Sequence, residues 1–207
     1  KVFMDEDILA HVRRYRLTTI DIVHRLYYPD SERDSAQKAL RRHVEKNELK
    51  SFDVKNRKFF YLSGARPLGS QTQWERYAVL NFCCARLPKR VRMTPAEFKE
   101  FFPDIAAQKG IKAAQQHFYS EDGKECLCRA LVDGTTPPER TARKCMDFLR
   151  TAVHIKGLSE LIELNLFVIS VLTAEPSKAS AIQQVISKQT IRPCFEIHVI
   201  EELKHLL

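Results

Sequence analysis

The segment LKSFDVKNRKFFYLS, residues 49–63, decides how the N-terminal part of the chain folds. Its two arms mix apolar, aromatic and polar residues around the polar tip Lys55-Asn56-Arg57-Lys58. Two short arms of strand-forming residues around a polar tip predict a β-hairpin. Because the tip holds three cations, the predicted hairpin carries positive charge at its end.

Three short amphipathic segments come before this hairpin. Residues 5–16, 18–28 and 31–48 each place apolar side chains at helical spacing along one face. Thr18 and Ser31 stand where the second and third helices would begin, and we expect their hydroxyls to cap those helices. The chain therefore predicts three helices followed by a hairpin.

Three helices and a basic-tipped hairpin are the order of a winged helix-turn-helix, which we expect over residues 1–63. In such a domain the third helix enters the major groove of double-stranded DNA and the hairpin contacts the phosphate backbone. The expected DNA-binding residues on the third helix are Arg33, Gln37, Lys38, Arg41 and Arg42, and those on the hairpin are Lys55, Asn56, Arg57 and Lys58. The alternative for any charged helix face is that it is only solvated.

Positive charge is concentrated in the same region. The whole chain has a formal charge of +8, and residues 1–66 hold fifteen Lys and Arg against ten Asp and Glu. An excess of cations on a small domain favours an anionic partner such as nucleic acid. The charge distribution therefore agrees with the predicted winged helix.

The rest of the chain predicts a linker with connecting helices over residues 64–110 and an α/β domain over residues 111–207. The second of these contains, in order, a hairpin, a helix, a continuous apolar strand at 166–174, another helix, a strand and a final helix. This order predicts a mixed sheet with helices on both faces. The expected fold class is α+β, a winged helix followed by a mixed-sheet α/β domain.

Taken together, these features resemble the replication-relaxation proteins of plasmids and mobile elements, which are related to plasmid mobilisation proteins. The resemblance rests on the winged helix, the turn Leu131-Val132-Asp133-Gly134-Thr135, the basic helix with Lys144 and the segment FVISVLTAEPSKASAIQQVI. It implies a C-terminal domain similar to the restriction-endonuclease fold, often with degraded catalytic positions. It also implies a role in plasmid replication, relaxation or DNA transfer, with replication or mobilisation proteins as partners.

A metal-dependent nuclease or nicking enzyme is the alternative function of a different class. Its candidate catalytic residues are Asp104, Glu125, Asp133 and Lys144, because Mg²⁺ needs converging carboxylates and a lysine would stabilise charge. The strand has no acid-x-lysine pair, however, so this set is incomplete. Asp133 could instead cap the turn before the helix, and Lys144 could be solvated. A ligand-responsive winged-helix transcription regulator is a further alternative.

Other functions lack their motifs. None of the six cysteines, Cys194 among them, forms a Cys-x-x-Cys pair, and no Gly-rich phosphate loop or Gly-x-Ser-x-Gly elbow occurs. The apolar strand at 166–174 is too short to span a membrane, so we expect a cytoplasmic protein without membrane partners. We expect no cofactor, or Mg²⁺ if the nuclease alternative holds. A homodimer is left open by the sequence.

Overall fold

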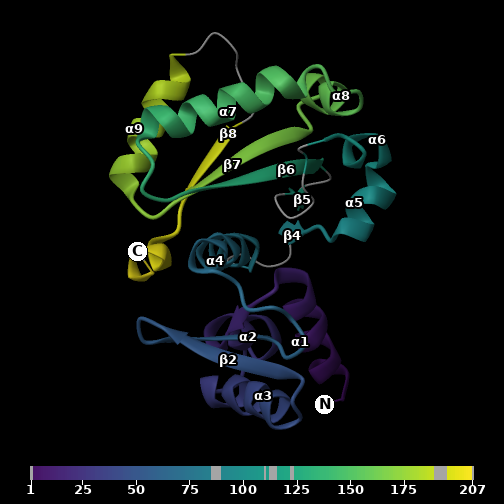
Figure 1. Ribbon diagram of the computed structural model, residues 1–207, viewed down its shortest axis with the longest axis vertical. Coiled ribbons are helices and arrows are strands. Elements are labelled where there is room, and N and C mark those ends of the chain that lie inside the picture. Colours follow the sequence, from purple (N-terminus) through teal and green to yellow (C-terminus); the bar gives the residue numbers. More distant parts are fainter. Residues whose placement is uncertain are drawn as a thin grey trace. The chain divides into compact units, whose positions relative to one another are not determined.

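The computed structural model describes residues 2–84, 90–109, 111, 116–121, 124–188 and 195–206 (Figure 1). The chain is α+β and, apart from its last two residues, divides into two compact units, residues 1–87 and 88–205. This boundary lies inside the segment 64–110, which we expected to be a linker with connecting helices. Its first helix belongs to the first unit, and its remaining described elements belong to the second unit.

The first unit combines four helices with a small antiparallel sheet. Its elements are α1 (Val2–Tyr15), β1 (Thr18–Thr19), α2 (Ile20–Tyr27), α3 (Arg33–Glu45), β2 (Leu49–Val54), β3 (Arg57–Leu62) and α4 (Ser70–Cys84). The strands lie in the order β1-β3-β2. The predicted hairpin is confirmed, and the two-residue strand β1 was not predicted.

The two faces of the hairpin pack against different helices. Phe60 and Leu49 lie in one cluster with Ile8 of α1 and Leu40 of α3, so this face closes over the first three helices. On the other face, Phe59 packs edge-to-face against Tyr77 of α4, with 5.2 Å between ring centroids. Helix α4 is therefore part of the core of this unit.

The starts of α2 and α3 differ from the expectation. Thr19 rather than Thr18 caps α2, since its hydroxyl accepts a bond from the backbone N–H of Ile22 at 3.3 Å. Thr18 lies in β1, and its Oγ1 is 3.1 Å from His11 Nε2. Helix α3 follows Glu32, which makes no side-chain capping bond, so Ser31 is not the cap. Both expected caps were wrong by one residue, because Thr18 lies in β1 and α3 begins after Glu32.

The second unit contains a five-stranded mixed sheet. Its elements are β4 (Arg90–Arg92), α5 (Pro95–Phe101), α6 (Pro103–Ala106), β5 (Gln116–Glu121), β6 (Lys124–Asp133), α7 (Pro138–Ala152), α8 (Leu158–Glu163), β7 (Phe167–Thr173), α9 (Pro176–Ser187), β8 (Phe195–Val199) and the 3-10 helix η2 (Glu201–His205). The strand order is β4-β5-β6-β7-β8, antiparallel from β4 to β6 and parallel from β6 to β8. The predicted mixed sheet is confirmed.

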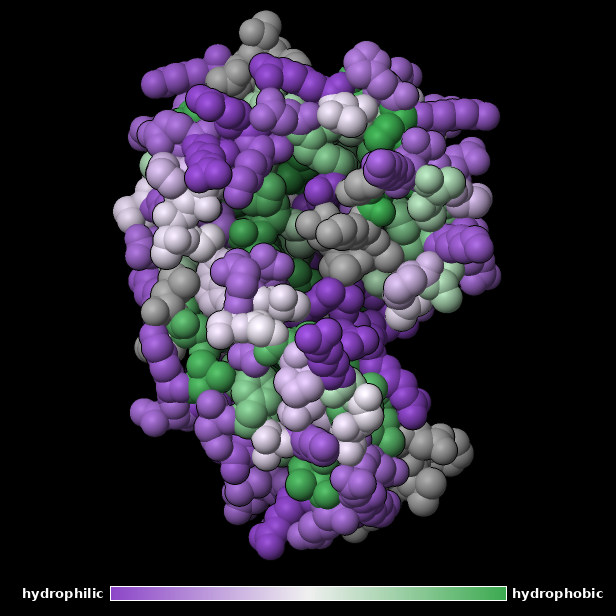
Figure 2. Space-filling view, viewed as in Figure 1, coloured by the Kyte–Doolittle hydropathy of each residue, from purple (hydrophilic) through white to green (hydrophobic). Residues whose placement is uncertain are grey.

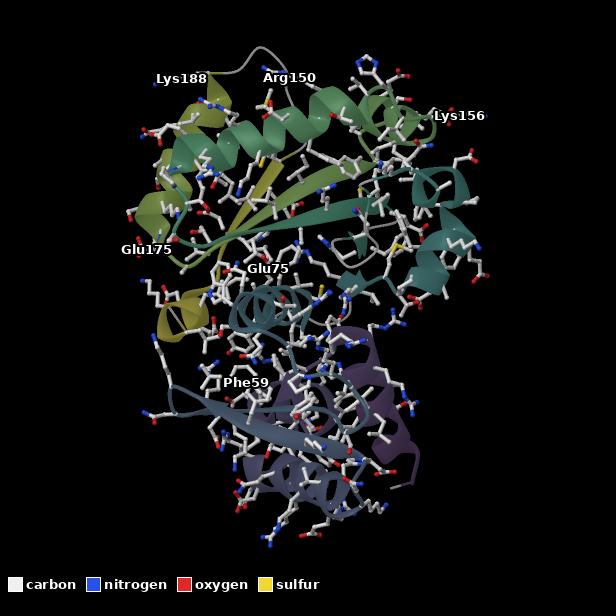
Figure 3. The ribbon with its side chains drawn as sticks, viewed as in Figure 1. Phe59, Glu75, Arg150, Lys156, Glu175 and Lys188 are labelled. Atoms are coloured by element: carbon white, nitrogen blue, oxygen red, sulfur yellow. The ribbon has the colours of Figure 1, made fainter. Side chains whose placement is uncertain are left out.

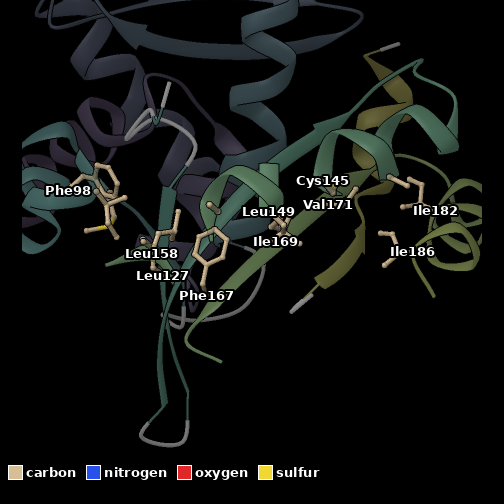
Figure 4. Packing of buried hydrophobic residues seen from close by; sticks show 14 residues of the cluster. Phe98, Leu127, Cys145, Leu149, Leu158, Phe167, Ile169, Val171, Ile182 and Ile186 are labelled. Carbon is tan, nitrogen blue, oxygen red and sulfur yellow. The ribbon is translucent and has the colours of Figure 1, made fainter. Parts of the chain in front are cut away.

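Helices α7 and α9 cover the same face of this sheet, as Figures 1 and 4 show. Their buried residues Leu149 and Ile182 share one cluster with Ile169 and Val171 of β7. We expected helices on both faces. Because β6, β7 and β8 are adjacent and parallel, right-handed crossovers place both connecting helices on one side. The other face carries a separate small cluster that includes Cys126.

Several local expectations can be checked in the second unit. Thr94 and Glu97 form a capping box at the start of α5. Strand β4 and helix α8 were not expected, and the expected final helix is the 3-10 helix η2. The turn residues 122–123 and Cys194 lie outside the described part of the chain. The five described cysteines are free and buried, which agrees with packing roles.

Candidate nucleic-acid interface

Helix α3 exposes one polar face because its other face is buried. Ala36, Ala39, Leu40 and His43 point into the core of the first unit. The helical repeat therefore turns the intervening positions outward. All five expected groove residues are exposed: Arg33, Gln37, Lys38, Arg41 and Arg42.

Two of these cations have acidic neighbours on the surface. Arg33 Nε lies 2.7 Å from Asp21 Oδ1 of α2, and Arg41 Nε lies 2.9 Å from Glu45 Oε1 one turn along α3. More than half of each of these four side chains is exposed. Such exposed pairs stabilise a protein by only about 0–1 kcal/mol, so a phosphate can compete for these arginines.

A hollow of about 960 Å³ runs beside α3. Its lining includes the cations Lys38, Arg41 and Arg42 together with Tyr27 and Tyr28 at the end of α2. Burial, aided by the negative charge of Asp7, raises the pKa of Tyr27 to about 12. The Tyr27 hydroxyl therefore stays protonated at neutral pH, and it donates a hydrogen bond of 3.3 Å to the Asp7 carbonyl.

The hairpin tip is tighter than the four residues expected from the sequence. Lys55 and Asn56 both have positive φ, 44° and 67°, while Val54 still pairs with Arg57. Positive φ at both central residues is the backbone of a two-residue type I′ turn. Lys55 and Asn56 are exposed at this turn.

The two cations that follow the turn have different environments. Lys58 is exposed and stands opposite Asp53 of β2. Arg57 is half-buried, with its guanidinium 5.2 Å from the centroid of the Tyr77 ring of α4. Arg57 thus holds the hairpin against α4, and Lys55 and Lys58 are the hairpin cations presented to solvent.

In the second unit, Asp133 lies at the end of β6 and is buried. Its Oδ1 accepts a 2.6 Å hydrogen bond from the Thr141 hydroxyl of α7, and its Oδ2 lies 2.8 Å from Lys178 Nζ of α9. Lys178 Nζ also donates to the Gly134 carbonyl. Asp133 therefore joins the end of β6 to the first turns of both helices.

The sequence did not lead us to predict Lys178 as the ion-pair partner of Asp133. The sequence suggested Lys144, but that side chain is exposed on the outer face of α7. A signal for Lys178 was nevertheless present, because Pro176 begins α9 and places Lys178 in its first turn. The carboxyl ends of parallel strands meet the starts of the following helices, which brings Lys178 close to Asp133.

The four candidate catalytic residues do not form one site. Glu125 is exposed at the start of β6, and the eight residues to Asp133 separate the two by about 26 Å along the strand. Asp104 is exposed on α6. The next residue, Ile105, lies 3.4 Å from the position that a Cβ at Gly157 would occupy, and Gly157 follows the C-terminal end of α7, away from Lys144. Within the described ranges, no three His, Cys, Asp or Glu side chains come together as a metal site.

A polar cluster lies on the face of the sheet that α7 and α9 leave uncovered, and the sequence did not indicate it. Glu196 Oε2 of β8 lies 2.8 Å from His198 Nε2 and 3.5 Å from an Arg90 nitrogen of β4. Since β4 and β8 are the two edge strands, the sheet must curve strongly for these residues to meet. His117 of β5 is buried nearby, and burial, with help from Arg90, lowers its pKa to about 3.

Comparison with known proteins adds no further evidence: no protein-family model matches the chain, and no curated protein matches it. Among the described helices, none is long and apolar enough to cross a membrane.

Proposed function

We propose that residues 2–62 form a winged helix-turn-helix that binds double-stranded DNA. The observation that carries the proposal is the order α1-β1-α2-α3-β2-β3, in which α3 presents its polar face outward. Strand β1 pairs with β3 and so ties the hairpin to the start of α2. A rigidly held hairpin beside an exposed cationic helix suits contact with a groove and its flanking phosphates.

The chemistry of α3 supports reading of base edges. Guanidinium groups can make paired hydrogen bonds to guanine, and an amide such as that of Gln37 can do the same with adenine. Arg41 and Arg42 follow Lys38 on the exposed side of the helix, so several contacts can form along one groove. In the proposal, Lys55 and Lys58 of the hairpin contact phosphates, which fix register without reading sequence.

The resemblance to replication-relaxation proteins extends this proposal. We infer a cytoplasmic role in replication, relaxation or transfer of a plasmid or mobile element, with replication or mobilisation proteins as partners. In this proposal the second unit is a degenerate relative of the restriction-endonuclease fold that serves assembly. The bonds that engage Asp133 with Thr141 and Lys178 support a structural rather than a catalytic use of that carboxylate.

The test is a salt titration of duplex binding by the full chain and by the Arg41→Ala/Arg42→Ala variant. Removal of two cations from the DNA-facing side of α3 should clearly reduce affinity at low salt and lower the slope of log affinity against log salt, by up to about 1.8 where both side chains also neutralise phosphates. A Lys50→Ala/Arg66→Ala variant is the matched control, since both residues are exposed cations of the same unit outside the proposed interface. Equal slopes in the wild type and the α3 variant would refute DNA binding through α3.

A further inference from the structure

The outer face of helix α7 carries cations that do not contribute to the packing of the second unit. Ala142, Cys145, Met146 and Leu149 point into the core, and the helical repeat turns the opposite side to solvent. Hydrophilic side chains cover the surface over α7 in the space-filling view (Figure 2). The exposed cations of the first half of the helix are Arg140, Arg143 and Lys144.

These three cations lack acidic partners. Asp147, the acid closest to them toward the C-terminal end, is already 3.0 Å from Arg150. Among the residues that the structure describes, no carboxylate lies within ion-pair distance of Arg140, Arg143 or Lys144. Their charges are therefore available to a ligand from outside the unit.

The positions of these three cations also do not stabilise helix α7. α7 begins at Pro138, and Pro137 before it makes no side-chain capping bond. The N-terminal end of a helix has a partial positive charge that acts within its first turn, so a cation at Arg140 is disfavoured there. A placement that works against local stability is expected at functional sites.

The spacing and shape of this face suit a polyanion. A hollow of about 450 Å³ is bordered by Pro137, Glu139, Arg140, Arg143, Lys144 and Asp147. Arg140 and Lys144 are one turn apart, about 6 Å along the axis. Two nucleotides of one DNA strand advance by about the same distance, close to 7 Å.

We propose that Arg140, Arg143 and Lys144 form a second contact surface for the phosphate backbone of DNA. This inference rests on the proposed function and names an additional surface for the same ligand. Because the three side chains contact phosphates rather than base edges, the surface adds affinity without sequence preference.

The experiment measures duplex binding by the full chain carrying Arg140→Gln, Arg143→Gln and Lys144→Gln. We expect an affinity loss of about tenfold or more at low salt, and a salt slope lower by up to about 2.7, because up to three phosphate contacts disappear. The matched control replaces three exposed lysines elsewhere in the same unit, Lys99→Gln, Lys156→Gln and Lys188→Gln, with the same change in net charge. Figure 3 labels Lys156 and Lys188.

The outcomes separate this inference from the proposed function. Loss of binding in the α7 variant with little loss in the lysine control supports the second surface. If the α7 variant binds like the control while Arg41→Ala/Arg42→Ala fails to bind, the second surface is refuted and the winged-helix proposal stands. If only the α7 variant loses binding, α3 is not the interface and α7 is. Thermal unfolding of each variant shows whether it is folded. The single change Lys144→Glu tests the same surface with fewer substitutions.

Discussion

Helix α3 and the end of β6 both bring a cation to within 3 Å of a carboxylate, yet the two regions differ in exposure. The side chains of Arg33 and Asp21 are 54% and 52% exposed, whereas those of Lys178 and Asp133 are 14% and 1% exposed. Water and salt screen the first pair, so breaking it has little effect on folding. The second pair lies inside the fold, where either charge left alone is strongly unfavourable.

The difference shows that residue type alone does not separate a binding site from a structural one. Asp133 was a candidate metal ligand because it follows an apolar strand. Its burial and its bonds to Thr141 and Lys178 instead join three elements of the second unit. The exposed cations of α3 can exchange partners at little cost, and this property suits binding to DNA.

Asp133→Ala should produce the largest effect, a loss of about 3–5 kcal/mol in the free energy of unfolding. The change leaves Lys178 without its carboxylate and Thr141 without its acceptor. Urea unfolding followed by circular dichroism measures the loss. Since folded domains are stable by only about 5–15 kcal/mol, the midpoint should fall clearly.

Lys144→Ala is the matched control for this prediction, because Lys144 was expected to act beside Asp133 in the candidate catalytic set and its side chain is exposed. Its unfolding midpoint should stay near that of the wild type. If Asp133→Ala unfolds like the wild type, or Lys144→Ala loses as much stability, the distinction between the two residues is wrong.

Acid should weaken both units through a buried histidine in each. Burial, with the charge of Arg14, lowers the pKa of His11 to about 4, and burial with Arg90 and His198 lowers that of His117 to about 3 against the opposing effect of Glu196. The unfolded chain takes up these protons near pH 6.5 and the folded chain does not. Stability is therefore fully present above about pH 6.5 and falls below it, by up to about 1.4 kcal/mol per pH unit for each histidine.

Unfolding at pH 7 and pH 5 measures this loss, and the single tryptophan, Trp74, reports on the first unit. His117→Leu should flatten the pH dependence of the circular dichroism transition, whatever its stability at pH 7. His154→Gln is the control, because His154 is exposed on the second unit. A His117→Leu protein with the wild-type difference between the two pH values would contradict the assignment.

The periodic features of the sequence were sufficient for most of the helices, the hairpin and the apolar strand, but not for α8. They could not reveal β1, since two threonines become a strand only when β3 lies beside them. They also could not pair Asp133 with Lys178, because 44 residues, which include α7, α8 and β7, lie between the two positions before the sheet brings them together. The cluster of Arg90, Glu196 and His198 depends on sheet curvature, which no local pattern encodes.

Removing an acid from α3 should strengthen DNA binding. In Glu45→Gln, Arg41 loses its partner at 2.9 Å and the helix gains one unit of positive charge. Affinity for a mixed-sequence duplex at low salt should rise a few-fold, while the free energy of unfolding falls by only about 0.2–0.5 kcal/mol. Fluorescence anisotropy against salt measures the gain. A weaker or unchanged affinity would mean that Arg41 does not face the DNA.

The smallest effect separates two adjacent hairpin residues. Arg57→Gln removes the guanidinium from the Tyr77 ring and should lower the free energy of unfolding by about 0.5–1 kcal/mol. Lys58→Gln should leave stability nearly unchanged, because Lys58 is exposed, and should reduce the salt slope of DNA binding by about 0.9. Thermal unfolding and anisotropy on both proteins provide the measurements. If the two substitutions exchange their effects, the hairpin contacts DNA through Arg57, and the packing against α4 is not what holds that side chain.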